Sequence, residues 1–278
     1  MSLMILLFLA ALPVILICRY IYMKDRNKES SGLLTKLFMC GILSCFLVLI
    51  ISGILFIFIP SFNKDIETMR FIEALIYAFI GVALIEESCK WLMVYKIGYN
   101  NKEFDEIYDM IVYAVFVSLG FAFFENVLYV LGKENVIAGI ATGISRALLA
   151  VPGHAWNAVF MGYYLCLAKL YSKQGKKDLE KKNIYKSIVI PTILHGIYDF
   201  CLFANVEVFI MIFFVFVITM YIISIKKVKE VAQITNRTPQ PQPQLQPIPI
   251  TPPTNNFCPV CGTKVIGNFC TNCGTRQA

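Results

Sequence analysis

The chain has 278 residues, of which 58% are hydrophobic and 15% are charged, with a formal net charge of +7. A soluble domain carries about 25% charged residues, so the composition excludes an ordinary water-soluble enzyme or binding domain. Apolar runs of roughly 20 residues, long enough to cross a bilayer as helices, recur from the first residue to about residue 225. Strand-like alternation is absent, and helices satisfy their own backbone in lipid. The sequence therefore predicts an all-α polytopic membrane protein.

We expect about seven transmembrane helices, and their order fits the distribution of positive charge. Lys and Arg concentrate in alternate connecting segments, at 19–36, 96–102, 169–186 and 226–237. By the positive-inside rule these segments are cytoplasmic, which puts the N-terminus outside and the C-terminus in the cytoplasm. This clustering beside the spans explains the net charge without nucleic acid. The predicted spans are about 2–22, 37–60, 71–95, 107–131, 150–170, 186–203 and 206–225.

The segment 135–152 is apolar but short, and it contains Gly139, Gly143 and Arg146. An eighth span here would move the basic loop at 172–186 to the outside, so we predict a re-entrant or interfacial segment. Arg146 would then reach the lipid headgroups. The first apolar run has its positive charges after it and is predicted to be a retained span, not a cleaved signal peptide.

Polar and ionisable side chains interrupt four consecutive predicted spans, where they are costly and usually functional. Spacings of three or four residues place the members of each group on one helix face. The chain has only two histidines, and both belong to this set. The residues are Glu86, Glu87 and Lys90 in the third span, Glu125 in the fourth, one turn after Phe121, His154 and Asn157 in the fifth, and His195 and Asp199 in the sixth.

Each of these residues also has a structural interpretation. Lys90 can neutralise a neighbouring Glu as an ion pair, and Asn157 can form a helix–helix hydrogen bond. Glu106 and Asp109, at a span end, are expected to be solvated. Two imidazoles with several carboxylates suit either a catalytic Zn²⁺ or water activation by a carboxylate without metal.

The C-terminal part differs in composition from the helical domain, which we place at 1–230. Residues 231–256 are rich in Pro and Gln and predict an extended linker. Residues 257–278 contain two CxxCG turns, a spacing typical of a zinc ribbon whose structural Zn²⁺ supplies the folding energy. Two disulfides are the alternative, although cytoplasmic thiols stay reduced. The predicted zinc ligands are Cys258, Cys261, Cys270 and Cys273.

The intramembrane residues resemble the motifs of the PrsW family of intramembrane proteases, over about residues 65–205. No single motif is specific, but four in order on successive helices are specific together. The wider superfamily includes the type II CAAX prenyl proteases and the scaffold subunit of gamma-secretase. The matching motifs are EExxK (Glu86, Glu87, Lys90), FxxxE (Phe121, Glu125), a His that opens a span (His154) and HxxxD (His195, Asp199).

The resemblance implies an endopeptidase with Glu86 as the base, Glu87 and Lys90 tuning it, and both histidines acting on the oxyanion or the leaving amine. His195 would be oriented by Asp199. The CAAX enzymes have FxxxH and HxxxN instead, so a catalytic metal remains an alternative to the favoured metal-free mechanism. The six residues implied as catalytic are Glu86, Glu87, Glu125, His154, His195 and Asp199, with Lys90 and Asn157 in support.

The resemblance also implies a substrate and a setting. PrsW-like proteins make the first, extracytoplasmic (site-1) cut in a single-pass anti-sigma factor of the bacterial cell membrane, which activates a sigma-factor stress response. The expected partners are membrane lipids, such a substrate, and an unknown cytoplasmic partner of the zinc ribbon. A non-catalytic membrane scaffold subunit and a proton-coupled transporter are the alternative functions.

Overall fold

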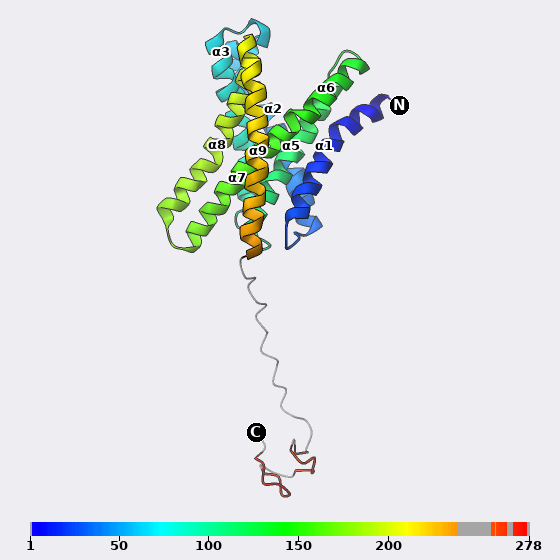
Figure 1. Cartoon of the computed structure of the whole chain (residues 1–278), viewed down its shortest axis with the longest axis vertical. Helices are drawn as coiled ribbons and strands as arrows, with labels where there is room; N and C mark the ends of the chain where they lie inside the picture. Colours follow the sequence, from blue (N-terminus) through cyan, green and yellow to red (C-terminus); the bar gives the residue numbers. More distant parts are fainter. Residues whose placement is uncertain (1, 238–256, 259, 266–268, 277–278) are drawn as a thin grey trace. The chain divides into compact units, whose positions relative to one another are not determined.

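The computed structural model describes residues 2–237, 257–258, 260–265 and 269–276, and it divides at about residue 238 into two units. Most of the predicted linker, at 238–256, lies outside the described residues. The first unit is built from helices (Figure 1). They are α1 (Ser2–Lys24), α2 (Ser31–Phe58), η1 (Pro60–Asn63), η2 (Ile66–Thr68), α3 (Phe71–Ile76), η3 (Tyr77–Ala83), α4 (Leu84–Ile97), α5 (Asp109–Leu131), α6 (Val136–Leu148), α7 (Ala150–Lys173), α8 (Lys177–Phe203) and α9 (Glu207–Arg237).

Within the described residues, 6 helical segments are long and apolar enough to cross a membrane. They are α1, α2, α5, the α6–α7 pair, α8 and α9. The third predicted span is also helical, but it consists of α3, the π-helix η3 and α4 in direct succession. The prediction of an all-α polytopic membrane protein is confirmed.

The segment 135–152 does not form the re-entrant turn that was one of its interpretations. It forms α6, which at about 20 Å is too short to cross a bilayer by itself. At Leu149 the chain bends and continues directly as α7, so α6 is the first part of that helical path and does not turn back (Figure 1). Asn135 caps α6 by accepting a hydrogen bond from the backbone amide of Ala138.

Helix α5 is the most buried span and packs against α1, α2, α6 and α7. Its contact with α2 is backbone to backbone, because a Cβ on Gly41 would lie 2.0 Å from the carbonyl oxygen of Val117. A Cβ on Gly120 would likewise lie 2.0 Å from the carbonyl oxygen of Phe38. Small residues at crossings let membrane helices approach in this way, and here they fix α5 against α2.

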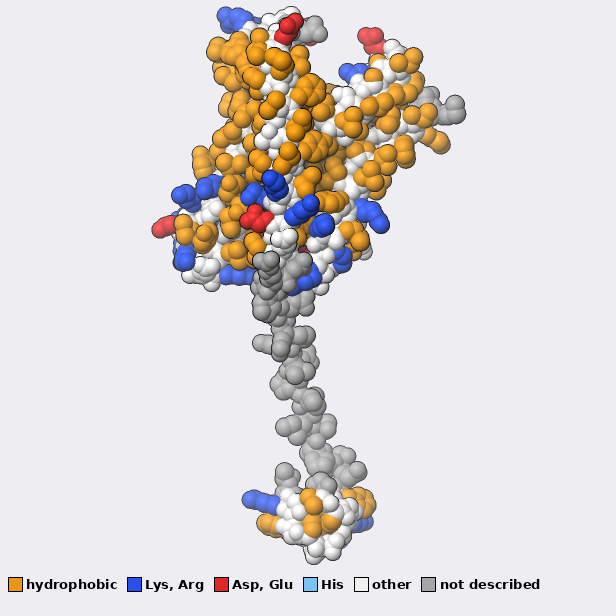
Figure 2. All heavy atoms as spheres, in the orientation of Figure 1, with side chains coloured by type: hydrophobic (Ala, Val, Ile, Leu, Met, Phe, Trp, Pro, Cys, Tyr) orange, Lys and Arg blue, Asp and Glu red, His pale blue; other side chains and the backbone are white. Residues whose placement is uncertain are grey.

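The outside of the first unit is apolar over most of the face that Figure 2 shows, as a surface that meets lipid requires. Exposed examples include Ile57, Phe58, Ile137 and Met211. Many Lys and Arg side chains gather at the end of the unit where α9 ends (Figure 2). This polarity agrees with the charge pattern from which the topology was predicted.

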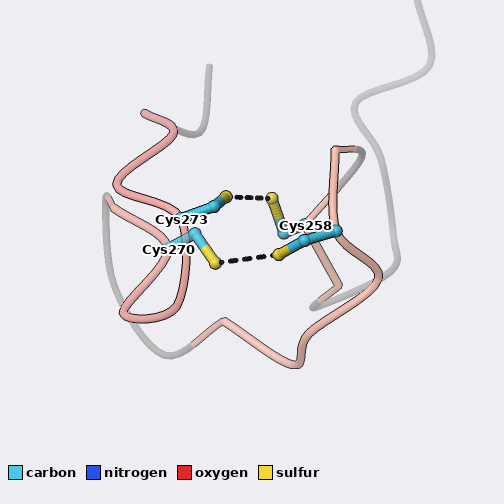
Figure 3. Close-up of side chains that lie close together, drawn as sticks. Cys258, Cys270 and Cys273 are labelled. Carbon is cyan, nitrogen blue, oxygen red and sulfur yellow. Dashed lines mark hydrogen bonds between the residues drawn. The ribbon is translucent and has the colours of Figure 1, made fainter.

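The second unit brings the four tail cysteines together at two equivalent turns. Sγ of Cys258 lies 3.4 Å from Sγ of Cys273, and Sγ of Cys261 lies 3.5 Å from Sγ of Cys270 (Figure 3). These distances are far beyond a disulfide bond of about 2.05 Å. Each CxxC is followed by a glycine with positive φ, at +69° and +75°, and each glycine amide donates to the carbonyl of the first cysteine of its own turn.

Candidate functional site

A cavity of about 370 Å³ lies among η3, α4, α5, α6, α7 and α8. It is lined by most of the ionisable residues predicted from the sequence together with aromatic side chains such as Tyr77 and Tyr198. Glu87 and Lys90 do not line it and are fully buried behind its wall. The predicted residues that line the cavity are Glu86, Glu125, His154, Asn157, His195 and Asp199.

Two local features bring α4 and α8 close enough to form this site. The π-helix η3 directly precedes the turn that carries Glu86 and Glu87, and π-helical turns are frequent at functional sites. Gly196 faces η3, where a Cβ would lie 2.5 Å from Cδ1 of Phe79. A larger residue at this position would push α8 away, so Gly196 allows the preceding residue, His195, to reach the glutamates of α4.

Lys90 is the centre of a hydrogen-bond network. Its Nζ lies 3.0 Å from Oε2 of Glu86, 3.0 Å from Oε1 of Glu87 and 3.0 Å from Nδ1 of His154. An ammonium has three protons and no acceptor, so Nδ1 of His154 is the acceptor in the third bond. The aromatic residue of the FxxxE motif, Phe121, makes a cation–π contact with this ammonium, because its ring centroid lies 4.0 Å from Nζ of Lys90.

His154 joins this network to Glu125. Its Nε2 lies 2.9 Å from Oε2 of Glu125, and because Nδ1 accepts from Lys90, a neutral His154 carries its proton on Nε2 and donates it. Arg146 donates to the same carboxylate oxygen at 2.5 Å and to Oδ1 of Asn126 at 2.6 Å. The guanidinium also lies 3.9 Å from the ring centroid of Tyr129. Glu125 is thereby held between a cation and an imidazole.

His195 lies between carboxylates on both sides. Its Nδ1 lies 2.9 Å from Oε1 of Glu87, so Glu87 also orients the ring, a part that the sequence interpretation gave to Asp199 alone. Its Nε2 lies 3.3 Å from Oδ2 of Asp199, without the alignment of a hydrogen bond, and 4.0 Å from Oε2 of Glu86. Ionised carboxylates only accept. Nδ1 therefore donates to Glu87, and Nε2 faces the carboxylates of Asp199 and Glu86.

Glu86, Glu87 and His154 place donor atoms within 4.8 Å of one another, and their types suit a divalent metal. Each of the three residues, however, directs a donor atom to Nζ of Lys90 at 3.0 Å. A metal ion bound by these atoms would take the position of the ammonium, and two cations cannot share it. Through these three atoms the group does not fit a metal while Lys90 is in place.

The expectations for four residues are wrong. Arg146 does not extend to headgroups but binds Glu125 inside the site. Glu106 and Asp109 are not solvated, with exposed fractions of 7% and 0%. Oδ1 of Asn157 has no hydrogen-bond partner among the described residues, so it forms no helix–helix bond through this atom. The sequence signal for Arg146 was a charge inside an apolar helix, the same signal that identified the other site residues.

Residues 29–224 match the family model described as PrsW family intramembrane metalloprotease. The chain belongs to the PrsW family. The matched region extends beyond the predicted 65–205 and includes the second span, whereas the four tail cysteines lie outside it. The PrsW chain is thus a multi-pass membrane protein of an intramembrane protease family. The word metalloprotease in the family description contrasts with the position of Lys90 among the candidate donor atoms.

Curated relatives named Protease PrsW are similar over most of this chain. One from Oceanobacillus iheyensis is 36% identical over 80% of this chain and 94% of its own length. One from Geobacillus kaustophilus is 37% identical over 69% of this chain and 77% of its own length. One from Bacillus subtilis is 34% identical over 69% of this chain and 80% of its own length. No solved structure matches the chain.

Proposed function

We propose that this PrsW chain is an intramembrane endopeptidase that uses Glu86 to activate water and needs no catalytic metal. The observation that carries this proposal is the cavity in which Glu86 and both histidines face the same space. The supporting groups lie behind that surface, since Lys90 and Glu87 are fully buried. Such an arrangement supplies a base, an oxyanion donor and a proton route in a site of low water content.

The hydrolysis follows from the positions of these groups. A water in the cavity gives a proton to Glu86 while its oxygen bonds to the carbonyl carbon of the scissile peptide. The His195 imidazolium donates a hydrogen bond to the resulting oxyanion. Glu86 then passes its proton to the peptide nitrogen as the carbon–nitrogen bond breaks. Lys90 holds Glu86 in place, and Glu87 holds His195.

We further propose that the cut lies on the extracytoplasmic side of a single-pass membrane protein such as an anti-sigma factor, in a bacterial cell membrane. Along an ideal helix, Glu125 lies roughly 9 Å from the end of α5 and Asp199 roughly 6 Å from the end of α8. These helix ends are opposite the end at which the basic side chains gather (Figures 1 and 2). With the N-terminus outside, this position of Glu125 and Asp199 supports a site-1 cut, which would activate a sigma-factor stress response.

For the tail, the proposal is a zinc ribbon with Cys258, Cys261, Cys270 and Cys273 as ligands. Four thiolates around a tetrahedral Zn²⁺ at about 2.3 Å are about 3.8 Å apart, close to the observed Sγ separations of 3.4 Å and 3.5 Å. The ribbon would bind an unidentified cytoplasmic partner.

The decisive experiment follows release of a labelled ectodomain from a single-pass substrate in proteoliposomes. Wild type should release the ectodomain, and Glu86→Ala/Glu87→Ala should not. Equal release of the ectodomain by wild type and by the variant would reject the proposed protease activity. A scaffold subunit would show no cleavage by the purified chain, and a proton-coupled transporter would show substrate flux without cleavage.

A second measurement separates the metal-free mechanism from the metal-dependent one. A chain that ends at residue 237 lacks the tail cysteines, so a strong chelator can act only on the helical unit. Activity should survive chelation. Loss of activity that is restored by added Zn²⁺, but not by Mg²⁺ or Ca²⁺, would contradict the metal-free mechanism.

A further inference from the structure

A second group of buried carboxylates lies at the other end of α5 from the catalytic cavity. It consists of Asp25, which follows α1, Glu106 in the connection between α4 and α5, and Asp109, the first residue of α5. One carboxylate oxygen of each lies within 4.8 Å of the other two. Along an ideal helix, Asp109 lies about 24 Å from Glu125. The two groups are separate sites.

The oxygens of this carboxylate group are buried and lack partners. Asp25 has an exposed fraction of 4%, and neither of its carboxylate oxygens has a hydrogen-bond partner among the described residues. The same holds for Oε2 of Glu106 and Oδ1 of Asp109. Buried polar atoms are nearly always paired, and burying an uncompensated charge is costly. Four such oxygens in one place indicate a missing positive partner.

The neighbouring basic residues do not supply it. Lys169 and Lys173 lie near Glu106, but Lys169 binds Asn100, and among the described residues neither forms an ion pair with the group. Arg26 binds Oε1 of Glu106 through Nε at 2.7 Å and through Nη2 at 2.5 Å. Nζ of Lys28 donates to the backbone carbonyls of Tyr22 and Asp25. Two cations therefore face three buried carboxylates.

The remaining neighbours add further negative charge. Glu29 is a fourth buried carboxylate and accepts a hydrogen bond at 2.8 Å from the hydroxyl of Tyr113. Asp105, on the same connection as Glu106, is exposed and binds Asn27. The four buried carboxylates of Asp25, Glu29, Glu106 and Asp109 thus exceed the charges of Arg26 and Lys28 by two, the charge of one divalent cation.

The backbone already holds part of the arrangement in place. Oδ2 of Asp109 accepts from the amides of Asp105 at 2.9 Å and Glu106 at 2.7 Å, which ties the connection before α5 to the first residue of the helix. Its second oxygen, Oδ1, has no hydrogen-bond partner among the described residues. Asp109 therefore presents one oxygen from a fixed position, as a metal ligand should.

We propose that Asp25, Glu106 and Asp109 bind a hard divalent cation that joins the end of α1 to the start of α5. Carboxylate oxygens without nitrogen or sulfur donors suit Mg²⁺, Mn²⁺ or Ca²⁺ and disfavour Zn²⁺. The cation clamps the connection after α1 against the connection before α5. It serves stability and helix registry, not peptide hydrolysis, and it does not depend on the proposed function.

Mn²⁺ is the probe, because its free form can be quantified by electron paramagnetic resonance. Zinc-loaded full-length protein in detergent micelles is titrated with Mn²⁺, with Mg²⁺ and Ca²⁺ as competitors. Wild type should bind Mn²⁺ saturably and gain a higher unfolding midpoint, as any ligand of the native state produces. Asp25→Asn should weaken the binding at least about ten-fold and remove the rise in midpoint.

The stability of Asp25→Asn also distinguishes a cation ligand from a carboxylate with a purely structural role. Without added cation the variant should be at least as stable as wild type, because it removes a buried charge without a partner. Absence of Mn²⁺ binding by wild type would overturn the proposal, and this outcome does not depend on whether the variants fold. Equal binding by Asp25→Asn would overturn it as well.

Two controls locate the ion. Asp105→Asn makes the same chemical change on the neighbouring exposed carboxylate and should bind Mn²⁺ like wild type. Glu86→Ala, in the membrane cavity, should also retain binding. Loss of Mn²⁺ binding in Glu86→Ala would place the ion in the catalytic site and reject the site proposed here.

Discussion

Nζ of Lys90 on α4 lies 3.0 Å from Nδ1 of His154 on α7, although the two residues are 64 positions apart in the sequence. The same ammonium donates to Glu86 and Glu87. All three of its protons are thus used within the site. Lys90 connects the two carboxylates of the EExxK motif to the histidine that faces them.

Replacement of Lys90 by Met should destabilise the protein as well as inactivate it. The change leaves Glu86 and Glu87 buried without a cation, and breaking a buried pair costs about 3–5 kcal/mol. Thermal unfolding in micelles and ectodomain release measure the two effects. Lys96→Met, at an exposed position in the last turn of the same helix, should change stability by no more than about 0.5 kcal/mol. Normal stability of Lys90→Met would contradict the buried network.

Arg146 should matter for catalysis, although its helix lies outside the four predicted motif helices. Arg146→Gln removes the cation that holds Glu125, which in turn holds His154. A small displacement of positioned groups can lower the rate about 100-fold, and we expect a loss of kcat of that size with little change in KM. Lys133→Gln, an exposed charge in the turn before α6, is the matched control. Full activity of Arg146→Gln would show that Glu125 needs no cation.

The sequence was sufficient to identify the motif residues, but not the course of the helices that connect them. Ionisable side chains stand out in an apolar span because lipid does not tolerate them unpaired, and Glu86, Glu125, His154 and His195 were found in this way. Arg146 was misplaced because its segment is too short to span, and the bend at Leu149 that joins α6 to α7 has no sequence signal. That bend turns Arg146 toward the cavity.

The same limit applies to pairings across helices. Spacing within one helix suggested that Asp199 orients His195, since the two lie one turn apart. The structure keeps Oδ2 of Asp199 3.3 Å from Nε2 of His195 and adds a hydrogen bond from Nδ1 to Glu87 on another helix, which the spacing did not predict. Helix faces follow from periodicity, whereas contacts between helices depend on crossings such as that at Gly196, where the absence of a Cβ sets the distance.

The crossing of α2 and α5 offers a stability test with an internal control. Gly41→Ala places a methyl group 2.0 Å from the carbonyl oxygen of Val117, a backbone atom that cannot rotate away. We expect a loss of about 3 kcal/mol, the upper end of the usual cost of overpacking. Gly53→Ala, on the same helix with nothing within 4 Å, should raise stability by up to about 1 kcal/mol. Unfolding in micelles measures both, and equal effects would contradict the close contact.

Glu86 and Glu87 are adjacent in the sequence but should respond differently to the same substitution. Glu86 lines the cavity, whereas Glu87 is fully buried and binds Lys90 and His195. Glu86→Gln removes the proposed base while keeping the shape, so kcat should fall at least about 1,000-fold. Glu87→Gln retains an amide oxygen that still accepts from Lys90 and His195, and kcat should fall only about ten-fold.

The comparison of the two variants distinguishes the base from the group that positions it. Stability should change little in Glu86→Gln, because the amide oxygen still accepts from Lys90, so its inactivity cannot be ascribed to unfolding. For Glu87→Gln the imidazole of His195 loses a charged partner, and the pH profile of kcat should shift while that of Glu86→Gln is flat at its residual rate. If the two variants were equally inactive with the same pH profile, the two glutamates would act as one unit and Glu86 would not be the sole base.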